Sequence, residues 1–148
     1  MTGETTPRAS APGTSTLPPP TARDHVTIRM PAEGAYLSVL RTATAGLAAR
    51  LDFTLDEIED LRIAVDEACA MLLAEAESGS TLECDFELGP DTMTISVSAR
   101  TRLGQLPAKD TFAWTVLTAL AGHVDSHVGL DDQVTIVLRK TRGHSGAG

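Results

Sequence analysis

Glu67 is the carboxylate whose neighbours in the sequence most favour acid–base chemistry. Within a predicted helix it lies roughly 130° around the axis from the centre of the main apolar stripe. A second, weaker apolar row accompanies it there, formed by Ile63, Ala70, Met71 and Ala74. A carboxylate in such a row is partly desolvated, which would raise its pKa toward that of a general base. The alternative is an ordinary surface carboxylate at the edge of the helix.

Two other pairs of residues have the types that metal or redox chemistry uses. His123 and His127 are four residues apart, but Gly122 ends the helical pattern before them, so they need not share a face. No further ligand with suitable spacing joins them, and we expect no metal site. Cys69 and Cys84 are interpreted as small buried thiols of the core, with a redox pair as the alternative.

Two helices are predicted in the first half of the chain, and the second of them carries Glu67. Between residues 33 and 51, apolar residues recur three and four positions apart, which predicts an amphipathic helix. Thr54 and Glu57 then form a capping box that marks the start of a second helix, expected to stop near Gly79. Its main apolar stripe consists of Ile58, Leu61, Val65, Ala68 and Leu72.

The remaining elements are strands and one more helix. Four stretches alternate between apolar and polar residues and are predicted strands: 25–30, 82–88, 93–99 and 134–138. A third helix is predicted over 111–121, with Trp114 in the core. The order β-α-α-β-β-α-β, with a single apolar sheet face, predicts an α+β fold. It would be a two-layer sandwich of a mostly antiparallel sheet with helices on one face.

Composition divides the 148 residues into one domain and two tails. Residues 1–23 hold five of the eight prolines and eight Ser or Thr residues, which predicts a disordered tail. Residues 141–148 contain three glycines and are predicted to be a flexible tail, which leaves 24–140 as the domain. The chain has no signal-peptide pattern, no apolar run near the ~20 residues of a membrane span and too few cysteines for a disulfide framework. These features predict a cytoplasmic protein.

The negative charge is concentrated in one part of the chain. The net charge is −8, and residues 52–91 hold thirteen Asp and Glu residues against one base, Arg62. Nucleic-acid phosphates would repel such a chain, so direct binding to nucleic acid is not expected. A basic protein partner fits better. The alternative is a solvated surface that only maintains solubility.

The segment from Asp56 to Met71 reads Asp-Glu-Ile-Glu-Asp-Leu-Arg-Ile-Ala-Val-Asp-Glu-Ala-Cys-Ala-Met, and it resembles the RsbW/SpoIIAB family. These are anti-sigma factors of the serine-kinase type with the histidine-kinase-like (Bergerat) ATPase fold, and the predicted element order matches. The resemblance extends over about residues 25–140. It implies that Glu67 holds the position of the general base. It also implies that Arg41, on the first helix, contacts both the sigma factor and its antagonist; the alternative is a surface arginine.

Against the family's pattern, the nucleotide-binding boxes of this chain are degenerate. The first box ends in an asparagine that holds Mg²⁺, whereas this chain has Met71, and a thioether is a poor ligand for a hard cation. The second box, Asp-x-Gly-x-Gly, has its aspartate and both glycines replaced, by Ala99, Thr101 and Leu103. The loop that contains them has a single glycine, so no glycine-rich phosphate cradle is expected. We therefore expect no bound cofactor.

The resemblance implies an anti-sigma factor that sequesters an alternative sigma factor of the stress or sporulation type. Release would follow by partner switching, in which an anti-anti-sigma factor competes for an overlapping surface. With its boxes degenerate the chain would be a pseudokinase, and Glu67 a vestigial general base. The alternative is an active serine/threonine kinase that uses Mg-ATP to phosphorylate the anti-anti-sigma factor. A plain interaction domain is a third reading, and the family also suggests a homodimer.

Overall fold

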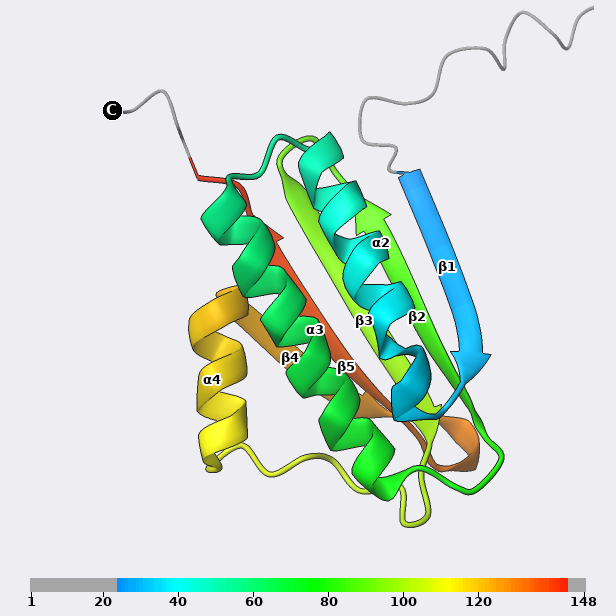
Figure 1. The fold of residues 1–148 in the computed structure, drawn as a ribbon. Coiled ribbons are helices and arrows are strands. Elements are labelled where there is room, and N and C mark those ends of the chain that lie inside the picture. Colours follow the sequence, from blue (N-terminus) through cyan, green and yellow to red (C-terminus); the bar gives the residue numbers. More distant parts are fainter. Residues whose placement is uncertain (1–23, 144–148) are drawn as a thin grey trace, which may run out of the picture.

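Alternating apolar residues build one antiparallel sheet in the computed structural model, which describes residues 24–143 (Figure 1). Its strands are β1 (Asp24–Pro31), β2 (Thr81–Leu88), β3 (Thr92–Arg100), β4 (His123–Val128) and β5 (Gln133–Thr141). They lie in the order β1-β2-β3-β5-β4, and every neighbouring pair is antiparallel.

Three α-helices cover one face of this sheet (Figure 1). They are α2 (Leu37–Arg50), α3 (Leu55–Glu75) and α4 (Phe112–Ala121), with short 3-10 turns η2 (Gly34–Tyr36) and η3 (Leu130–Asp132). The predicted capping box is confirmed, because Thr54 Oγ1 accepts from Glu57 N and Glu57 Oε1 accepts from Thr54 N. Trp114 is buried, as predicted.

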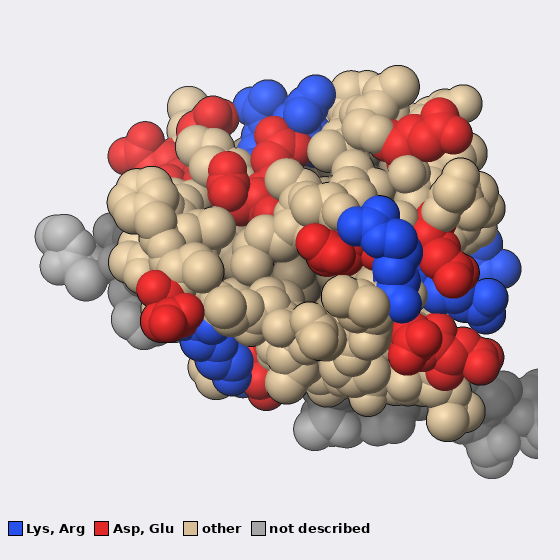
Figure 2. Space-filling model, turned by 90° about the horizontal axis from the view of Figure 1, so that it is seen from below, with Lys and Arg blue, Asp and Glu red and all other residues tan. Residues whose placement is uncertain are grey.

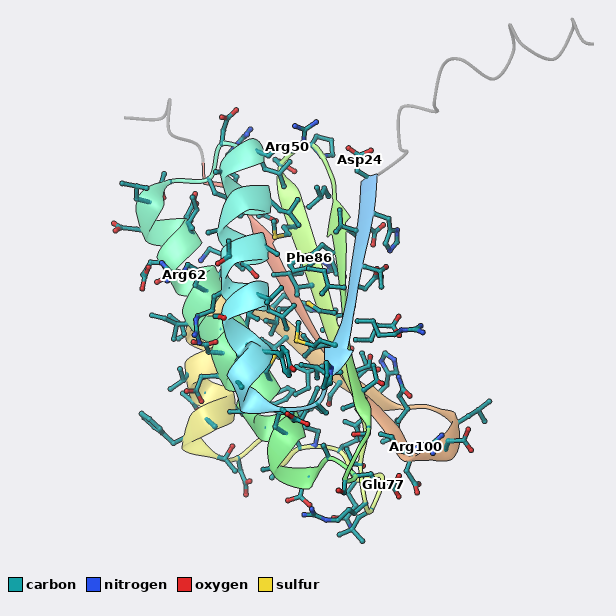
Figure 3. All side chains as sticks on the ribbon, turned by 45° about the vertical axis from the view of Figure 1, so that its right-hand side comes forward. Asp24, Arg50, Arg62, Glu77, Phe86 and Arg100 are labelled. Atoms are coloured by element: carbon teal, nitrogen blue, oxygen red, sulfur yellow. The ribbon has the colours of Figure 1, made fainter. Side chains whose placement is uncertain are left out.

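The core lies between the helices and the sheet. Four residues of the predicted α3 stripe are buried there, and so are the alternate residues of the central strands. Phe86 of β2 points from the sheet toward the helices and is fully buried (Figure 3). The predicted α+β two-layer fold, with helices on one face of the sheet, is therefore confirmed.

Two elements differ from the sequence-based expectation. Strand β4 was not predicted, because Ser126 interrupts the apolar side of its alternation and His123, Asp125 and His127 make the other side polar. Helix α3 ends at Glu75 rather than near Gly79. The backbone turns extended at Ala76, which pairs with Thr101 just after β3, and Gly79 lies in the turn that follows.

The other face of the sheet is polar, and no helix within residues 24–143 covers it (Figure 1). On this face His25 Nε2 lies 2.7 Å from Asp85 Oδ2, and Thr27 Oγ1 donates to Asp85 Oδ1 at 2.8 Å. The hydrogen bond with Asp85 and the charge of that carboxylate raise the pKa of His25. No helix in the described part of the chain is long and apolar enough to cross a membrane.

Both ends of the described chain lie at the same end of the sheet (Figure 1). β5 continues through Thr141, one residue past the predicted domain limit. Arg142 Nη1 then donates to Leu51 O at 2.9 Å, and Gly143 N donates to Glu57 Oε2 at 2.8 Å. The predicted tail 1–23, and residues 144–148 of the predicted C-terminal tail, lie outside the described residues.

Candidate functional site

A cleft of about 340 Å³ lies between the last turns of α3 and the connection from β3 to α4. These segments lie at the end of the sheet opposite the two ends of the described chain (Figure 1). Three of the positions that mark the degenerate nucleotide boxes lie together in the wall of the cleft: Met71, Thr101 and Leu103. The complete lining is Met71, Leu72, Glu75, Thr101, Leu103, Gln105, Leu106, Pro107, Ala108 and Val134. The cleft is therefore the place where the family's nucleotide chemistry would be expected.

Hydrogen bonds fix the floor of the cleft. Thr101 N donates to Asp132 O at 3.0 Å, and Arg102 N donates to Glu75 O at 2.9 Å, so the two residues that follow β3 are held between η3 and α3. Gly104 N donates to Thr101 Oγ1 at 2.9 Å. Gly104 has a φ of +62°, a conformation that glycine adopts without steric cost. The loop for which the resemblance predicts two glycines is here a turn with one, Gly104.

The charges around the cleft do not suit a triphosphate. None of the described residues that line it is basic, and Glu75 contributes a carboxylate whose Oε1 lies 3.2 Å from Arg102 Nη2. Seen from this end, Lys and Arg lie beside Asp and Glu rather than in a patch of one sign (Figure 2). Arg100 and Glu77 are one such pair, with Arg100 Nη1 lying 4.0 Å from Glu77 Oε1 (Figure 3). Phosphate sites in proteins use bases, backbone N–H groups or a bound cation.

The residues present do not fit Mg-ATP. Met71 offers a thioether in place of a hard oxygen ligand. Ala99 is fully buried on the helix side of β3, and its methyl group can neither donate nor accept a hydrogen bond. Thr101 already uses its hydroxyl to accept from Gly104 and to donate to Asp132 O. The expectation that no cofactor binds stays a prediction.

Glu67 is half-buried on α3, one turn before Met71, and does not line the cleft. Of the row predicted to accompany it, Ile63, Ala70 and Ala74 are exposed and Met71 is half-buried. Within residues 24–143 its carboxylate has no hydrogen-bond or ion-pair partner, so nothing in this part of the chain orients it as a base. Its role as a vestigial general base stays a prediction.

Arg41 lies on α2 and is not part of the cleft. Its Nη1 lies 3.0 Å from Asp66 Oδ1 and 3.1 Å from Asp66 Oδ2 on α3, and the two side chains are 38% and 36% exposed. Asp66 could not be predicted from the sequence, because a contact between two helices leaves no local spacing signal. Arg41 is thus held by an ion pair across the helices, with part of its side chain at the surface.

The remaining candidates are not assembled into a site. His123 and His127 lie on the same face of β4, but four residues of a strand separate them by roughly 13 Å, too far for one metal ion. No group of three or more His, Cys, Asp or Glu in the described residues is arranged to hold a metal. Cys69 and Cys84 are buried and not joined in a disulfide. Burial, with Asp66 nearby, raises the pKa of Cys69 to about 12, and burial raises that of Cys84 as well.

Comparisons with known proteins point to one class, the RsbW-type anti-sigma factors and serine-protein kinases. No family model matches the chain. The chain is 38% identical to the serine-protein kinase RsbW of Halalkalibacterium halodurans over 74 residues. This aligned stretch covers 49% of this chain and 46% of that protein. The chain is also 34% identical over 90 residues to the anti-sigma-F factor RsbW of Mycobacterium tuberculosis, covering 61% of this chain and 54% of that protein.

A solved structure shares the fold. The crystal structure of RsbU and RsbW domains from Mycobacterium tuberculosis matches 82% of this chain and 33% of that one, with a TM-score of 0.65 and 15% identity. The predicted resemblance is confirmed: this chain is RsbW-like in sequence and shares its fold with that structure. It spans about half the length of the curated relatives that it matches.

Proposed function

We propose that the chain is an anti-sigma factor that binds and sequesters an alternative sigma factor and does not use a kinase step. The observation that carries the proposal is the combination of RsbW-like sequence with a cleft whose residues do not fit Mg-ATP. A surface that binds a partner does not depend on the nucleotide chemistry. Partner binding can therefore persist when nucleotide binding is lost. An anti-anti-sigma factor would release the sigma factor by competing for an overlapping surface.

Arg41 is the residue that we propose for the partner surface. It is exposed enough to be reached, and the ion pair with Asp66 fixes the position of its guanidinium. An arginine held in this way loses less conformational entropy when a partner carboxylate binds it. Arg41→Glu is expected to weaken sigma-factor binding strongly. Arg50→Glu, at the exposed end of the same helix, is the matched control.

The test is binding of the purified chain to each sigma factor encoded in the same genome, measured by calorimetry with and without Mg-ATP. The proposal expects one alternative sigma factor to bind with the same affinity in both conditions. Binding to none of them would leave only a general interaction domain and would refute the anti-sigma role. The same samples, run on a sizing column with light scattering, test the expectation of a homodimer.

An active serine/threonine kinase is the second candidate, favoured by the name of several relatives and by the glutamate at position 67. It requires transfer of labelled phosphate from Mg-ATP to an anti-anti-sigma factor, and loss of that transfer in Glu67→Gln. Glu59→Gln, an exposed carboxylate on the same helix, is the control. Transfer that depends on Glu67 would replace the first candidate by the second.

A further inference from the structure

The cleft that does not fit a nucleotide has the features of a site for another kind of molecule. We propose that it binds an uncharged, largely apolar small molecule. Its volume of about 340 Å³ lies within the range of ~300–1,000 Å³ that is usual for small-molecule sites. Most of its lining is apolar: Met71, Leu72, Leu103, Leu106, Pro107, Ala108 and Val134.

The polar groups of the cleft define the charge of the ligand. The one carboxylate of the lining, Glu75, is paired with Arg102, which leaves the wall close to neutral. The hydroxyl of Thr101 is already used on both sides by backbone groups. The amide of Gln105 has no hydrogen-bond partner within residues 24–143, so it can orient one polar atom of a ligand. A neutral molecule with a single polar group matches this set best.

Two leucines of the cleft face water in the free protein. Leu103 is 65% exposed and Leu106 is 51% exposed, an arrangement that a bound apolar molecule would make favourable by removing their surface from water. Two segments of the lining also differ in how firmly they are held. Hydrogen bonds fix Thr101 to Gly104, whereas no backbone hydrogen bond ties residues 105–107 to another part of the described chain. The cleft thus combines a fixed segment, residues 101–104, with a segment that can adapt to a ligand, residues 105–107.

The first experiment titrates the protein with N-phenyl-1-naphthylamine, a neutral dye that fluoresces in apolar surroundings. Saturable binding is expected, and Leu106→Glu should weaken it about tenfold or more because a charge would enter the apolar wall. Leu55→Glu is the matched control, since Leu55 is 84% exposed at the first turn of α3, far from the cleft. Both leucines are exposed, so neither variant should prevent folding.

The second experiment locates the dye. The chain has four methionines, of which Met71 alone lines the cleft within the described residues. In protein labelled with ¹³C at the methionine methyl groups, the dye should shift the Met71 signal and leave that of the buried Met93 unchanged.

Three outcomes would overturn the proposal: no saturable binding, equal loss of binding in both leucine variants, or displacement of the dye by Mg-ATP. The last would make the cleft a nucleotide site. Sigma-factor affinity is measured separately on Leu106→Glu. Absence of saturable dye binding therefore does not count against the anti-sigma proposal, nor the reverse, whereas displacement of the dye by Mg-ATP would also count against the absence of a kinase step.

Discussion

Replacing Gly104 with alanine should destabilise the protein and loosen the floor of the cleft. Gly104 has a φ of +62°, which strains any residue with a Cβ. A Cβ built there would also overlap Asp132 Oδ1 and lie 2.9 Å from Asp132 Cγ and 3.0 Å from Asp132 Cβ. The Gly104 amide donates to Thr101, so displacement of this turn is transmitted to the lining of the cleft.

Two further variants separate the causes. Gly79 has a φ of +76° and open space around it, so Gly79→Ala reports the backbone strain alone, about 1 kcal/mol. Gly104→Ala adds the overlap with Asp132, whose exposed side chain can partly rotate away, for a total of about 2 kcal/mol. In an Asp132→Gly background the overlap is gone, and Gly104→Ala should cost only about 1 kcal/mol. Asp132 itself has a φ of +58°, which glycine accepts.

Urea unfolding followed by the fluorescence of Trp114, the single tryptophan, measures these free energies. The midpoint should fall in the order wild type, Gly79→Ala, Gly104→Ala, with the slope unchanged. The reasoning is refuted if Gly104→Ala is no less stable than Gly79→Ala, or if Asp132→Gly fails to rescue it. In either case the overlap with Asp132 does not cause the extra loss of stability. Dye binding should weaken in Gly104→Ala and stay unchanged in Gly79→Ala.

Three other predictions concern separate parts of the molecule. Met71→Asn should not create saturable binding of Mg-ATP in calorimetry, because a restored amide leaves the rest of the wall unchanged; saturation would refute this. Cys69 and Cys84 should react with a thiol reagent only as fast as the protein unfolds, since both are buried and their pKa values are raised; a fast reaction in the folded state would contradict it. The pKa of His25 is raised from 6.5, so its contribution to stability is full below that pH and is lost as the pH rises through the raised value. The destabilising effect of His25→Gln should therefore shrink toward alkaline pH in urea unfolding, and an effect independent of pH would show that Asp85 does not interact with the ring.

Local patterns predicted the elements that have strong local signals. The capping box of Thr54 and Glu57 predicted the start of α3, and the apolar stripe of this helix predicted its buried face. Strand β4 escaped prediction because only Val124 and Val128 mark its inner side, and a strand at the edge needs fewer buried residues than a central one. The end of α3 was misplaced because pairing of Ala76 with Thr101, far along the chain, stops the helix before the glycine does.

The candidate site shows the same division between local and distant information. Met71, Thr101 and Leu103 were singled out by their positions in a motif, and the fold brings them into one wall. Gln105 and Leu106 have no such motif, and their place in the cleft depends on how the connection to α4 runs across the end of the sheet. The ion pair between Arg41 and Asp66 arises from the packing of α2 on α3, which no spacing within either helix reveals.

The position of the two described ends has a consequence for engineering. Asp24 pairs with Leu88, Leu88 with Met93 and Met93 with Lys140, so three strand spacings, roughly 14 Å, separate the first strand from the end of the last. A linker of about five extended residues would bridge that gap. Residues 24–143 could therefore be inserted into a surface loop of a reporter protein. The cleft would then point away from the host, and ligand binding could be read out without labelling.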